Sequence, residues 1–330
     1  MDFLDVLGIT SIMEGLKKRV ENALMPYKTE QVSPKRYIYR PQNLDELIGQ
    51  ENTKERLKLI IQKNQRMKPT HVILSGTKGC GKSTIAMILG EELGFTMNYY
   101  IGGAFTLDNL RKFIVKNQDD NIPNVLFLDE IHATKRDVIE YLYPILEDFI
   151  LPEGKNVKLR PFVFIGATTD KNVLIKKYSP LIDRCEDVIL EQYTIEDIKQ
   201  IIIQYNDKLY QRNIEEEIYN IIAQNTRFTP RIAIQWLEDL VICEDIQKIM
   251  MAHRVIKNGI TFIDKCILQH LADVGKPVGI EALAMIAGVT REDYNYVIEP
   301  YILSQGYISR TAKGRVLTLK GKEFLQKEIK

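Results

Sequence analysis

The chain has 330 residues, of which 45% are hydrophobic and 27% charged, and its 45 Lys and Arg nearly balance 44 Asp and Glu. This length favours two or three domains with a sizeable core and excludes a single small module. The near-neutral charge excludes a uniformly basic nucleic-acid coat. Residues 306–330, however, carry seven Lys and Arg against two Glu, so any nucleic-acid contact is expected there.

Targeting and metal-binding signals are absent from the sequence. No stretch approaches the ~20 apolar residues of a membrane span, and a signal peptide would need basic residues where Asp2 and Asp5 stand. The four cysteines form no CxxC pair and have no His at metal-ligand spacing. We expect reduced thiols, no zinc site, no membrane contact and a cytoplasmic location.

The first predicted element is an amphipathic helix that opens with the capping box Ser11–Glu14 and ends near Met25, ahead of Pro26. The polar stretch Lys28–Tyr39 is typical of a linker. We therefore expect residues 1–38 to form an N-terminal helical extension and linker.

From His71 onward, short apolar runs alternate with helical periods. The predicted buried strands are Val72–Leu74, Val125–Leu128, Phe162–Ile165 and Val188–Leu190. After the first of them, a Gly-rich turn leads into a helix that has its apolar face at Ile85, Ile88, Leu89 and Leu93 and ends at Gly94. Strands that alternate with helices predict a parallel α/β sheet.

Two further regions follow the predicted sheet. A mostly helical region begins at Thr194–Asp197 and predicts a small all-α domain. In Phe262–Leu325, helical periods are followed by two β-type runs, Tyr307–Arg310 and Arg315–Leu319. Helices followed by a tight hairpin predict a winged-helix module.

The segment Gly76–Ser83 matches the P-loop pattern G-x-x-x-x-G-K-[ST] between a predicted strand and a predicted helix. Its glycines let backbone N–H groups turn toward phosphate oxygens, and the helix start adds partial positive charge. Lys82 would neutralise the β- and γ-phosphates, Ser83 would ligate Mg²⁺, and Thr84 would lie beside the α-phosphate. We expect ATP and Mg²⁺ as cofactors, held by Gly79, Gly81, Lys82, Ser83 and Thr84.

The run Val125–Leu128 ends in two adjacent carboxylates, Asp129 and Glu130, about fifty residues after the P-loop. Asp129 would hold Mg²⁺ through water, together with Ser83, and Glu130 would polarise the attacking water as general base. For His132, a structural role is favoured over nucleotide sensing.

The run Phe162–Ile165 leads into Gly-Ala and then Thr168 and Thr169, hydroxyl side chains suited to sensing a γ-phosphate. Thr169 is the preferred sensor and Thr168 the alternative. Local sequence alone leaves equally open that both threonines cap the following turn.

Two arginines are candidates for contact with nucleotide. Arg184 would matter if it reached the ATP of a neighbouring subunit, where an arginine supplied in trans stabilises transition-state charge; alone, it is equally typical of a surface ion pair. Thr229, Pro230 and Arg231 are better defined. Thr229 is expected to cap a helix, Pro230 to take its first position, and Arg231 to lie in its first turn at the lid.

The C-terminal hairpin is basic. Arg310 and Arg315 flank the turn Thr311–Gly314, with Lys313 at its tip. Such a tip suits DNA phosphate or minor-groove contacts, which carry affinity more than sequence information; a solvated turn that is basic by accident is the alternative. Tyr294 and Tyr296 favour core packing over base stacking.

In this order, the motifs resemble those of the AAA+ ATPases, and within them the RuvB-type Holliday junction branch-migration motors. The resemblance extends from about Tyr39 to Leu325. It rests on Arg40–Gln50, the P-loop, Leu128–His132, Tyr143–Phe149, Ile165–Thr169, Thr229–Ala233, Pro277–Gly279, Glu299–Tyr301 and Arg310–Arg315. It implies a large P-loop ATPase domain (39–190), a small helical lid (191–256) and a winged-helix DNA-binding domain (257–330).

The resemblance also implies residue roles and partners. Tyr39, Arg40 and Ile48 would line the adenine pocket, while Glu147–Phe149 and Tyr193 would lie near the nucleotide. Arg231 would be the second sensor, and both wing arginines, Arg310 and Arg315, would touch DNA. Family members form hexameric rings that pull duplex DNA while RuvA holds the junction.

The chain departs from the family pattern in several places. Thr77, Lys78 and Cys80 replace the usual P-loop prolines and leucine, with the phosphate-binding groups intact, and Asp170 replaces an Arg after the two threonines. Where the family commonly has two arginines around the arginine finger, this chain has Ile182 and Arg184, so Arg184 is the one remaining candidate for the finger. Ile150–Pro161 is shorter than the hairpin that docks on RuvA, which argues against a standard RuvA partnership. Together with the extension 1–35, this suggests a phage or mobile-element version.

The main functional hypothesis is an ATP-hydrolysing ring motor on four-way-junction or duplex DNA. The alternative is an ATP switch similar to a clamp loader or helicase loader, which acts on a protein partner at DNA. A third reading, a DNA-binding adaptor with a vestigial ATPase, is disfavoured because Lys82, Ser83, Asp129 and Glu130 are all present.

Overall fold

The computed structural model describes residues 39–66, 68–152 and 157–328. The chain divides after Tyr39 into two units, and Arg40–Lys330 holds every helix and strand named below. The helix predicted to end near Met25 and most of the predicted linker lie outside the described residues. In the described ranges, no helix is both long enough and apolar enough to span a membrane.

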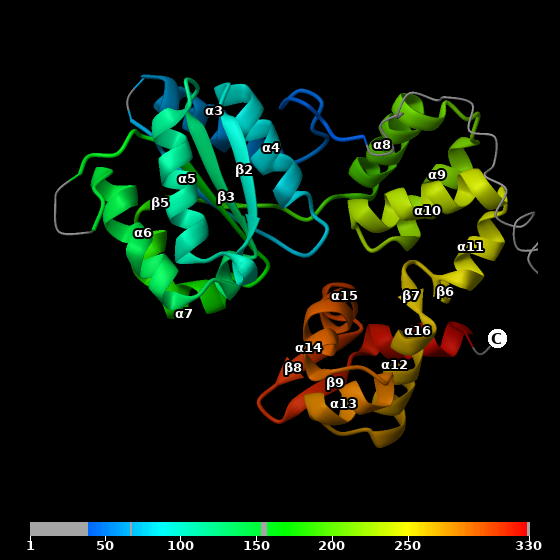
Figure 1. Cartoon of the computed structure of the whole chain (residues 1–330). Coiled ribbons are helices and arrows are strands. Elements are labelled where there is room, and N and C mark those ends of the chain that lie inside the picture. Colours follow the sequence, from blue (N-terminus) through cyan, green and yellow to red (C-terminus); the bar gives the residue numbers. More distant parts are fainter. Residues whose placement is uncertain (1–38, 67, 153–156, 329–330) are drawn as a thin grey trace, which may run out of the picture. The chain divides into compact units, whose positions relative to one another are not determined.

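The first module is a parallel sheet with helices on both faces (Figure 1). Its elements are α3 (Glu51–Arg66), β1 (His71–Ser75), α4 (Lys82–Leu93), β2 (Thr96–Ile101), η1 (Gly102–Ala104), α5 (Leu107–Asp119), β3 (Asn124–Asp129), η2 (Ile131–Ala133), α6 (Arg136–Asp148), β4 (Val163–Thr168), α7 (Lys171–Ile182) and β5 (Cys185–Ile189). The five strands follow the order β2-β3-β4-β1-β5, and every neighbouring pair is parallel. The predicted parallel α/β sheet is confirmed.

The strand order brings three polar loops together. Because β4 lies between β3 and β1, the residues that follow these three strands meet at one carboxyl edge. In register, Ser75 of β1 pairs with Thr168 of β4, and Leu128 of β3 pairs with Gly166. Ligands of open parallel sheets bind outside this edge, and the P-loop, Asp129 and Thr169 are all placed there.

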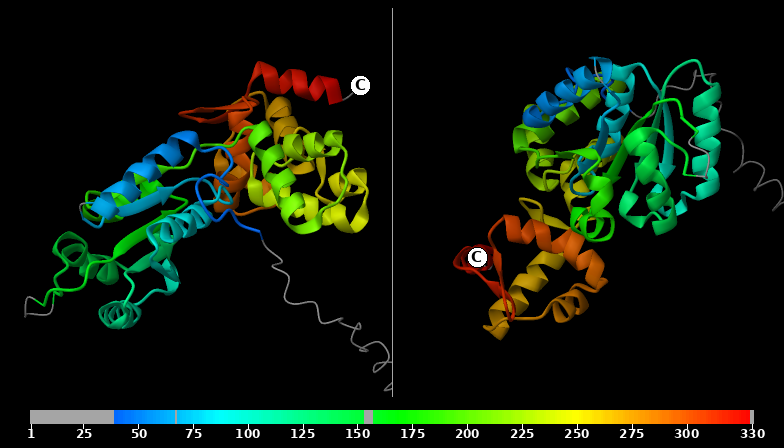
Figure 2. Two further views of the ribbon diagram at one scale, coloured as in Figure 1. Left: turned by 90° about the horizontal axis from the view of Figure 1, so that it is seen from above. Right: turned by 90° about the vertical axis from the view of Figure 1, so that its left-hand side faces the viewer.

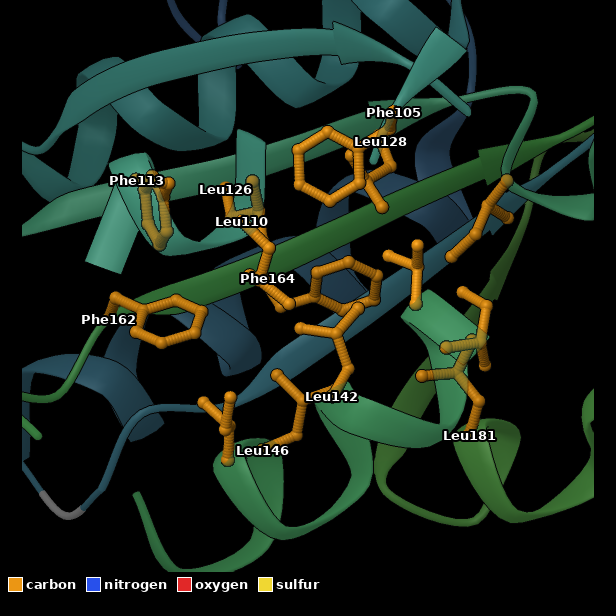
Figure 3. Close-up of a cluster of buried hydrophobic side chains, with 14 of the residues drawn as sticks. Phe105, Leu110, Phe113, Leu126, Leu128, Leu142, Leu146, Phe162, Phe164 and Leu181 are labelled. Atoms are coloured by element: carbon orange, nitrogen blue, oxygen red, sulfur yellow. The ribbon is translucent and has the colours of Figure 1, made fainter. Parts of the chain in front are cut away.

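The core of this module lies between the sheet and α5, α6 and α7 (Figure 3). Phe113 of α5, Leu142 of α6 and Leu181 of α7 pack with Leu126 and Phe164 of the central strands, and all five are buried. On the other face, α4 packs on the central strands and α3 packs on α4 and β5. Burial on both faces explains why the central strands are continuous apolar runs.

The strand boundaries differ from expectation at the edges of the sheet. The strand β4 begins at Val163, one residue after the predicted start, and β5 covers Cys185–Ile189 instead of Val188–Leu190. The edge strand β2 was not predicted. Edge strands face solvent and carry polar side chains, so they lack the apolar run by which a buried strand is recognised.

His71 is a buried polar anchor at the start of β1. Its Nε2 lies 2.9 Å from the Leu146 carbonyl oxygen, and its Nδ1 accepts the Phe164 N–H at 3.1 Å. Burial lowers the pKa of His71 from 6.5 to about 4, against the opposing effect of the Leu146 hydrogen bond. The ring is therefore neutral at pH 7 and joins β1 to both α6 and β4.

A pH-dependent loss of stability follows from His71. Because the folded-state pKa is below the unfolded one, the unfolded chain binds the extra proton, so stability is full above about pH 6.5 and falls as the pH drops toward 4. The loss should reach about 3 kcal/mol below pH 4. Urea unfolding of the wild type and of His71→Asn between pH 7.5 and 4.5 tests this, since Asn keeps an acceptor for Phe164 but cannot titrate. An identical pH slope in both proteins would contradict it.

The helical region after the sheet is confirmed. It contains α8 (Ile195–Tyr205), the π-helical turn η3 (Asn206–Tyr210), α9 (Glu216–Asn225), α10 (Pro230–Cys243) and α11 (Ile246–Ala252). At the start of α8, the Thr194 side chain accepts from the Asp197 N–H while the Asp197 side chain accepts from the Thr194 N–H. This reciprocal capping box stabilises the start of α8 at the residues where the sequence analysis placed the beginning of the helical region.

The C-terminal module is a winged helix. Its elements are β6 (Val255–Lys257), β7 (Ile260–Thr261), α12 (Phe262–Val274), α13 (Ile280–Ala287), α14 (Arg291–Asp293), the π-helical turn η4 (Tyr294–Ile298), α15 (Glu299–Ser304), β8 (Ile308–Thr311), β9 (Gly314–Leu317) and α16 (Leu319–Glu328). The β8–β9 hairpin projects from the module as a wing (Figures 1 and 2). The β6–β7 hairpin was not predicted.

The predicted wing hairpin is confirmed with a shorter turn. Thr311 and Gly314 pair with each other, so the turn has two residues instead of four. Gly314 has a φ of +137°, and a Cβ there would lie 2.4 Å from the Val278 carbonyl oxygen. Glycine is required because Val278 pairs with the wing at this point. Tyr294 is buried as expected, but Tyr296 is 60% exposed, so core packing was wrong for Tyr296.

Candidate active site

The P-loop connects the end of β1 to the start of α4. Gly79 and Gly81 have φ values of +82° and +97°, and a Cβ on Gly79 would lie 2.9 Å from Cγ2 of Thr229. The loop therefore needs glycine both for its conformation and for its contact with the lid. The Lys82 ammonium donates to two loop carbonyl oxygens, at 2.8 and 3.0 Å. This loop and the N-terminus of α4 form a cradle suited to a phosphate chain.

Ser83 and Asp129 meet across the carboxyl edge of the sheet. The Ser83 hydroxyl donates to Oδ2 of Asp129 at 3.0 Å. Hydroxyl and carboxylate oxygens are suitable donors for Mg²⁺, which binds one or two protein oxygens and completes its octahedral shell with phosphates and water. Among the described residues, no group of three or more His, Cys, Asp or Glu could hold a metal by itself. Tyr99, which the sequence did not single out, lies 3.4 Å from the same carboxylate.

Glu130 is held in a defined orientation beside Asp129. It has a φ of +50°, and its N–H donates to Oδ1 of Asp129 at 3.0 Å. A Cβ on Gly102 would lie 2.5 Å from the Glu130 carbonyl oxygen, so Gly102 makes room for this backbone. The Thr169 hydroxyl donates to Oε2 of Glu130 at 2.9 Å. The candidate sensor and the candidate base are therefore in direct contact.

The two threonines at the end of β4 differ in their partners. The Thr168 hydroxyl is buried, lies 2.9 Å from Nδ1 of His132 and accepts the Asp170 N–H at 3.0 Å. Thr168 is thus engaged in the following turn, as the turn-capping alternative predicted. Thr169 alone presents its hydroxyl to Glu130, which favours it as the sensor.

The lid helix α10 begins against the P-loop. Pro230 is its first residue, and a Cβ on Gly79 would lie 3.3 Å from Cβ of Arg231. Within the described residues, the exposed Arg231 guanidinium has no ion-pair partner. The predicted Thr229 cap is wrong in detail, because the Thr229 hydroxyl donates to the Arg227 carbonyl at 3.0 Å instead of accepting from the helix.

Arg184 lies at the opposite edge of the sheet. It precedes β5, whose first residue, Cys185, pairs with His71 at the start of β1, whereas the P-loop follows the end of β1. The Arg184 guanidinium donates to the Glu147 carboxylate and lies 5.4 Å from the centre of the Tyr143 ring. In the single chain, Arg184 is therefore the ion-pair partner that the alternative reading expected.

A pocket of about 620 Å³ lies at this second edge. Its lining includes Lys63, Lys68, His71, Glu147, Phe149 and Arg184. Glu147–Phe149 were expected to lie near the nucleotide. For a nucleotide bound at the P-loop of the same chain this expectation is wrong, because these residues lie at the opposite edge of the sheet. They form the C-terminal end of α6 and its cap, which pack on the start of β1. Arg184 and Glu147 thus form one basic and acidic cluster away from the cradle.

Comparison with known proteins gives the family. The RuvB P-loop domain of the Holliday junction DNA helicase matches residues 39–191, and the RuvB C-terminal winged helix domain matches residues 257–326. The Holliday junction branch migration complex subunit RuvB of Thermotoga maritima is 32% identical over 333 residues, covering 91% of this chain and 98% of the relative. This chain belongs to the RuvB family. The RuvB subunit of Fervidobacterium nodosum is 34% identical over 324 residues, covering 89% of this chain and 92% of the relative.

Solved structures agree with RuvB membership. The Thermotoga maritima RuvB Holliday junction branch migration motor matches with a TM-score of 0.73 and 33% identity, covering 87% of this chain and 98% of that chain. The Aeropyrum pernix ORC2 protein, at a TM-score of 0.55 and 13% identity, shares the fold alone. The predicted RuvB resemblance, the P-loop sheet and the winged helix are confirmed, and the chain falls in a family of P-loop ATPases.

In this RuvB-family chain, the segment before α3 packs on the connection between β5 of the sheet and α8 of the lid. Gln50 donates to the Glu191 carbonyl at 2.7 Å and accepts the Glu191 N–H at 2.9 Å, a linking role that the sequence did not reveal. Ile48 belongs to the same half-buried segment, and the Tyr193 hydroxyl lies 3.4 Å from the position of a Cβ on Gly81. The Arg40 guanidinium contacts Met87 of α4 at 2.8 Å, and the adenine role of Tyr39 stays a prediction.

The RuvB wing brings its two predicted DNA-contacting arginines together. Arg310 and Arg315 are direct cross-strand neighbours, and both bond to the buried carboxylate of Glu299. Lys313 is exposed at the turn. The sequence analysis included Glu299 only as part of the family motif Glu299–Tyr301 and did not link it to the arginines, the nearer of which lies eleven residues later in a different element.

Proposed function

We propose that this RuvB-family chain is an ATP-driven DNA motor that moves the branch point of four-way junctions during recombination and repair, as a hexameric ring on duplex DNA in the cytoplasm. The observation that carries the proposal is the separation of the site into two edges. The phosphate cradle lies at the carboxyl edge of the sheet and Arg184 at the amino edge. Five-residue strands hold these edges ~13 Å apart at ~3.3 Å per residue.

At the carboxyl edge, each polar side chain has a role in the proposed reaction. Lys82 binds the β- and γ-phosphates, and Ser83 with Asp129 holds Mg²⁺, which supplies charge neutralisation on the phosphates. Glu130 accepts a proton from the attacking water while Thr169 fixes its carboxylate through the 2.9 Å hydrogen bond. Arg231 lies in the first turn of α10, next to the P-loop, and contacts the γ-phosphate. When the γ-phosphate is lost, this contact is lost too and the lid moves.

At the amino edge, Arg184 completes the site of the next subunit. A second chain whose P-loop docks at the 620 Å³ pocket would place its γ-phosphate beside this guanidinium. The arginine then stabilises transition-state charge in trans, so hydrolysis requires an assembled ring. The wing residues Arg310, Lys313 and Arg315 bind the DNA backbone in the same proposal.

In the segment between α6 and β4, the described residues on either side of 153–156 pair with each other: Ile150 is bridged to Lys158, and the Leu151 N–H donates to the Val157 carbonyl oxygen at 3.0 Å. Because segment 150–161 is shorter than the family hairpin that docks on RuvA, it offers such a partner less surface to contact. We therefore propose DNA as the main partner and treat a RuvA-like junction-binding protein as a variable of the test.

The test is ATP-driven dissociation of a synthetic four-way junction by the full chain, with and without a host RuvA. The motor should separate the arms with ATP and Mg²⁺, while Lys82→Ala should not. ATP hydrolysis that neither junction DNA nor RuvA changes, with intact junctions throughout, would contradict the motor and favour the loader-like switch.

A further inference from the structure

Glu299 is a fully buried carboxylate beneath the wing. At the first residue of α15, it is 0% exposed and accepts four hydrogen bonds from two arginines. Nε and Nη2 of Arg310 donate to Oε1 and Oε2 at 3.0 and 3.1 Å. The same two nitrogens of Arg315 donate to the same two oxygens at 2.6 and 3.0 Å. One carboxylate therefore holds both guanidinium groups by the same edge.

The edge of each guanidinium that Glu299 binds determines which of its N–H groups remain free for another ligand. A guanidinium has five N–H groups in a rigid fork and can bind oxygen pairs through two edges, one containing Nε and one containing both terminal nitrogens. Glu299 takes the Nε edge of each arginine, which leaves the terminal edge to other acceptors. Within the described residues, neither terminal edge has a further ion-pair partner. The Arg310 side chain is 54% exposed and that of Arg315 is 18% exposed, so Arg310 offers the more accessible edge.

The wing geometry explains why a buried carboxylate is needed. Arg310 and Arg315 are opposite each other in the hairpin, where two like charges repel. The backbone of Arg315 is fixed on its other side by two hydrogen bonds with Val278, at 2.8 and 3.0 Å. Burial opposes ionisation of Glu299, but the bonds from Arg315 and Arg310 outweigh it and lower its pKa. The trio carries two positive charges and one negative, which leaves a net positive wing.

We propose that Glu299 is the positioning residue of the wing: it holds the two arginines by their Nε edges so that the terminal edge of Arg310 meets a DNA phosphate oxygen pair already oriented. This rests on the proposed DNA function and adds to it a residue that itself touches no DNA. The arginine then loses little side-chain freedom on binding, and a bidentate phosphate contact forms at a small entropic cost.

Glu299→Gln separates positioning from simple electrostatics. The substitution removes a negative charge near DNA, so electrostatics alone predicts tighter binding. It also replaces an accepting oxygen with an N–H₂ group that faces the arginine donors. Without the carboxylate, both arginine side chains must be ordered when DNA binds, so positioning predicts junction or duplex affinity about tenfold weaker. Fluorescence anisotropy of the full chain at fixed salt measures it. Tighter or unchanged binding would overturn the proposal.

A second variant keeps the test decisive if Glu299→Gln fails to fold, which thermal melting would show. Arg310→Lys preserves the charge on an exposed side chain but has no second edge, so it cannot hold Glu299 and a phosphate pair together. It should weaken binding nearly as much as Arg310→Ala. The matched control is Arg291→Lys, which replaces an arginine of the same module that is 60% exposed and paired with Glu281; it should leave binding unchanged.

Arginine Nε–H signals in the NMR spectrum of the free chain provide a direct readout. Arg310 and Arg315 should show slowly exchanging Nε–H protons that persist in the DNA complex and are lost in Glu299→Gln. If the wild type binds DNA and Arg310→Lys binds it equally well, the positioning role is refuted and the motor proposal stands. Wild-type protein that binds no DNA refutes the proposed function itself.

Discussion

Glu130→Gln should bind ATP normally and hydrolyse it at least ~100-fold more slowly than the wild type, because a general base contributes ~10²–10⁴ to the rate. Glutamine keeps the shape of the side chain and can still accept from Thr169, which now donates to Glu130 at 2.9 Å. What it lacks is the capacity to take a proton. The variant should therefore trap the ATP-bound state.

Steady-state phosphate release and binding of a fluorescent ATP analogue, measured side by side, test this prediction. Glu140→Gln is the matched control, because Glu140 is an exposed carboxylate of α6 paired with Arg136 at 2.7 Å. It should hydrolyse ATP at the wild-type rate. Normal turnover by Glu130→Gln would remove Glu130 from the role of base, and a loss of ATP binding would indicate a structural defect instead.

Arg184→Ala should lose ~10³-fold in hydrolysis while its own P-loop still binds ATP, since arginines supplied in trans contribute ~10³–10⁵. The physical reason is the placement of Arg184 at the amino edge, bonded to Glu147 and stacked on Tyr143. From there it cannot reach the cradle of its own chain. Arg136→Ala, which removes an exposed arginine from a pair on α6, should leave hydrolysis unchanged.

Mixing two inactive variants tests whether Arg184 acts in trans. Lys82→Ala destroys the cradle and keeps Arg184, whereas Arg184→Ala keeps the cradle. Where an intact cradle meets an intact arginine from the neighbouring subunit, a complete site forms, so mixed samples should regain a fraction of wild-type hydrolysis. Mixtures that stay as inactive as their components, although size-exclusion chromatography shows them to co-assemble, would contradict the trans site.

The contiguous parts of the site followed from the sequence alone. The P-loop, the Asp129–Glu130 pair and the two threonines are short patterns in which neighbouring residues share one strand end or one helix start. Their backbone geometry is set by local chemistry such as the glycines at 79 and 81, with φ values of +82° and +97°. Short continuous apolar runs likewise predicted the central strands, since both faces of these strands are covered.

Tertiary structure alone decided which distant residues meet. The sheet order places Thr169 against Glu130 and sends Arg184 to the edge away from the cradle, and neither result is encoded within a short segment. Glu299 shows the same limit: its partners lie eleven and sixteen residues later, in β8 and β9. Local patterns report the conformations that neighbouring residues favour, whereas contacts between elements depend on how strands are ordered and faces are buried, and only the folded chain determines these.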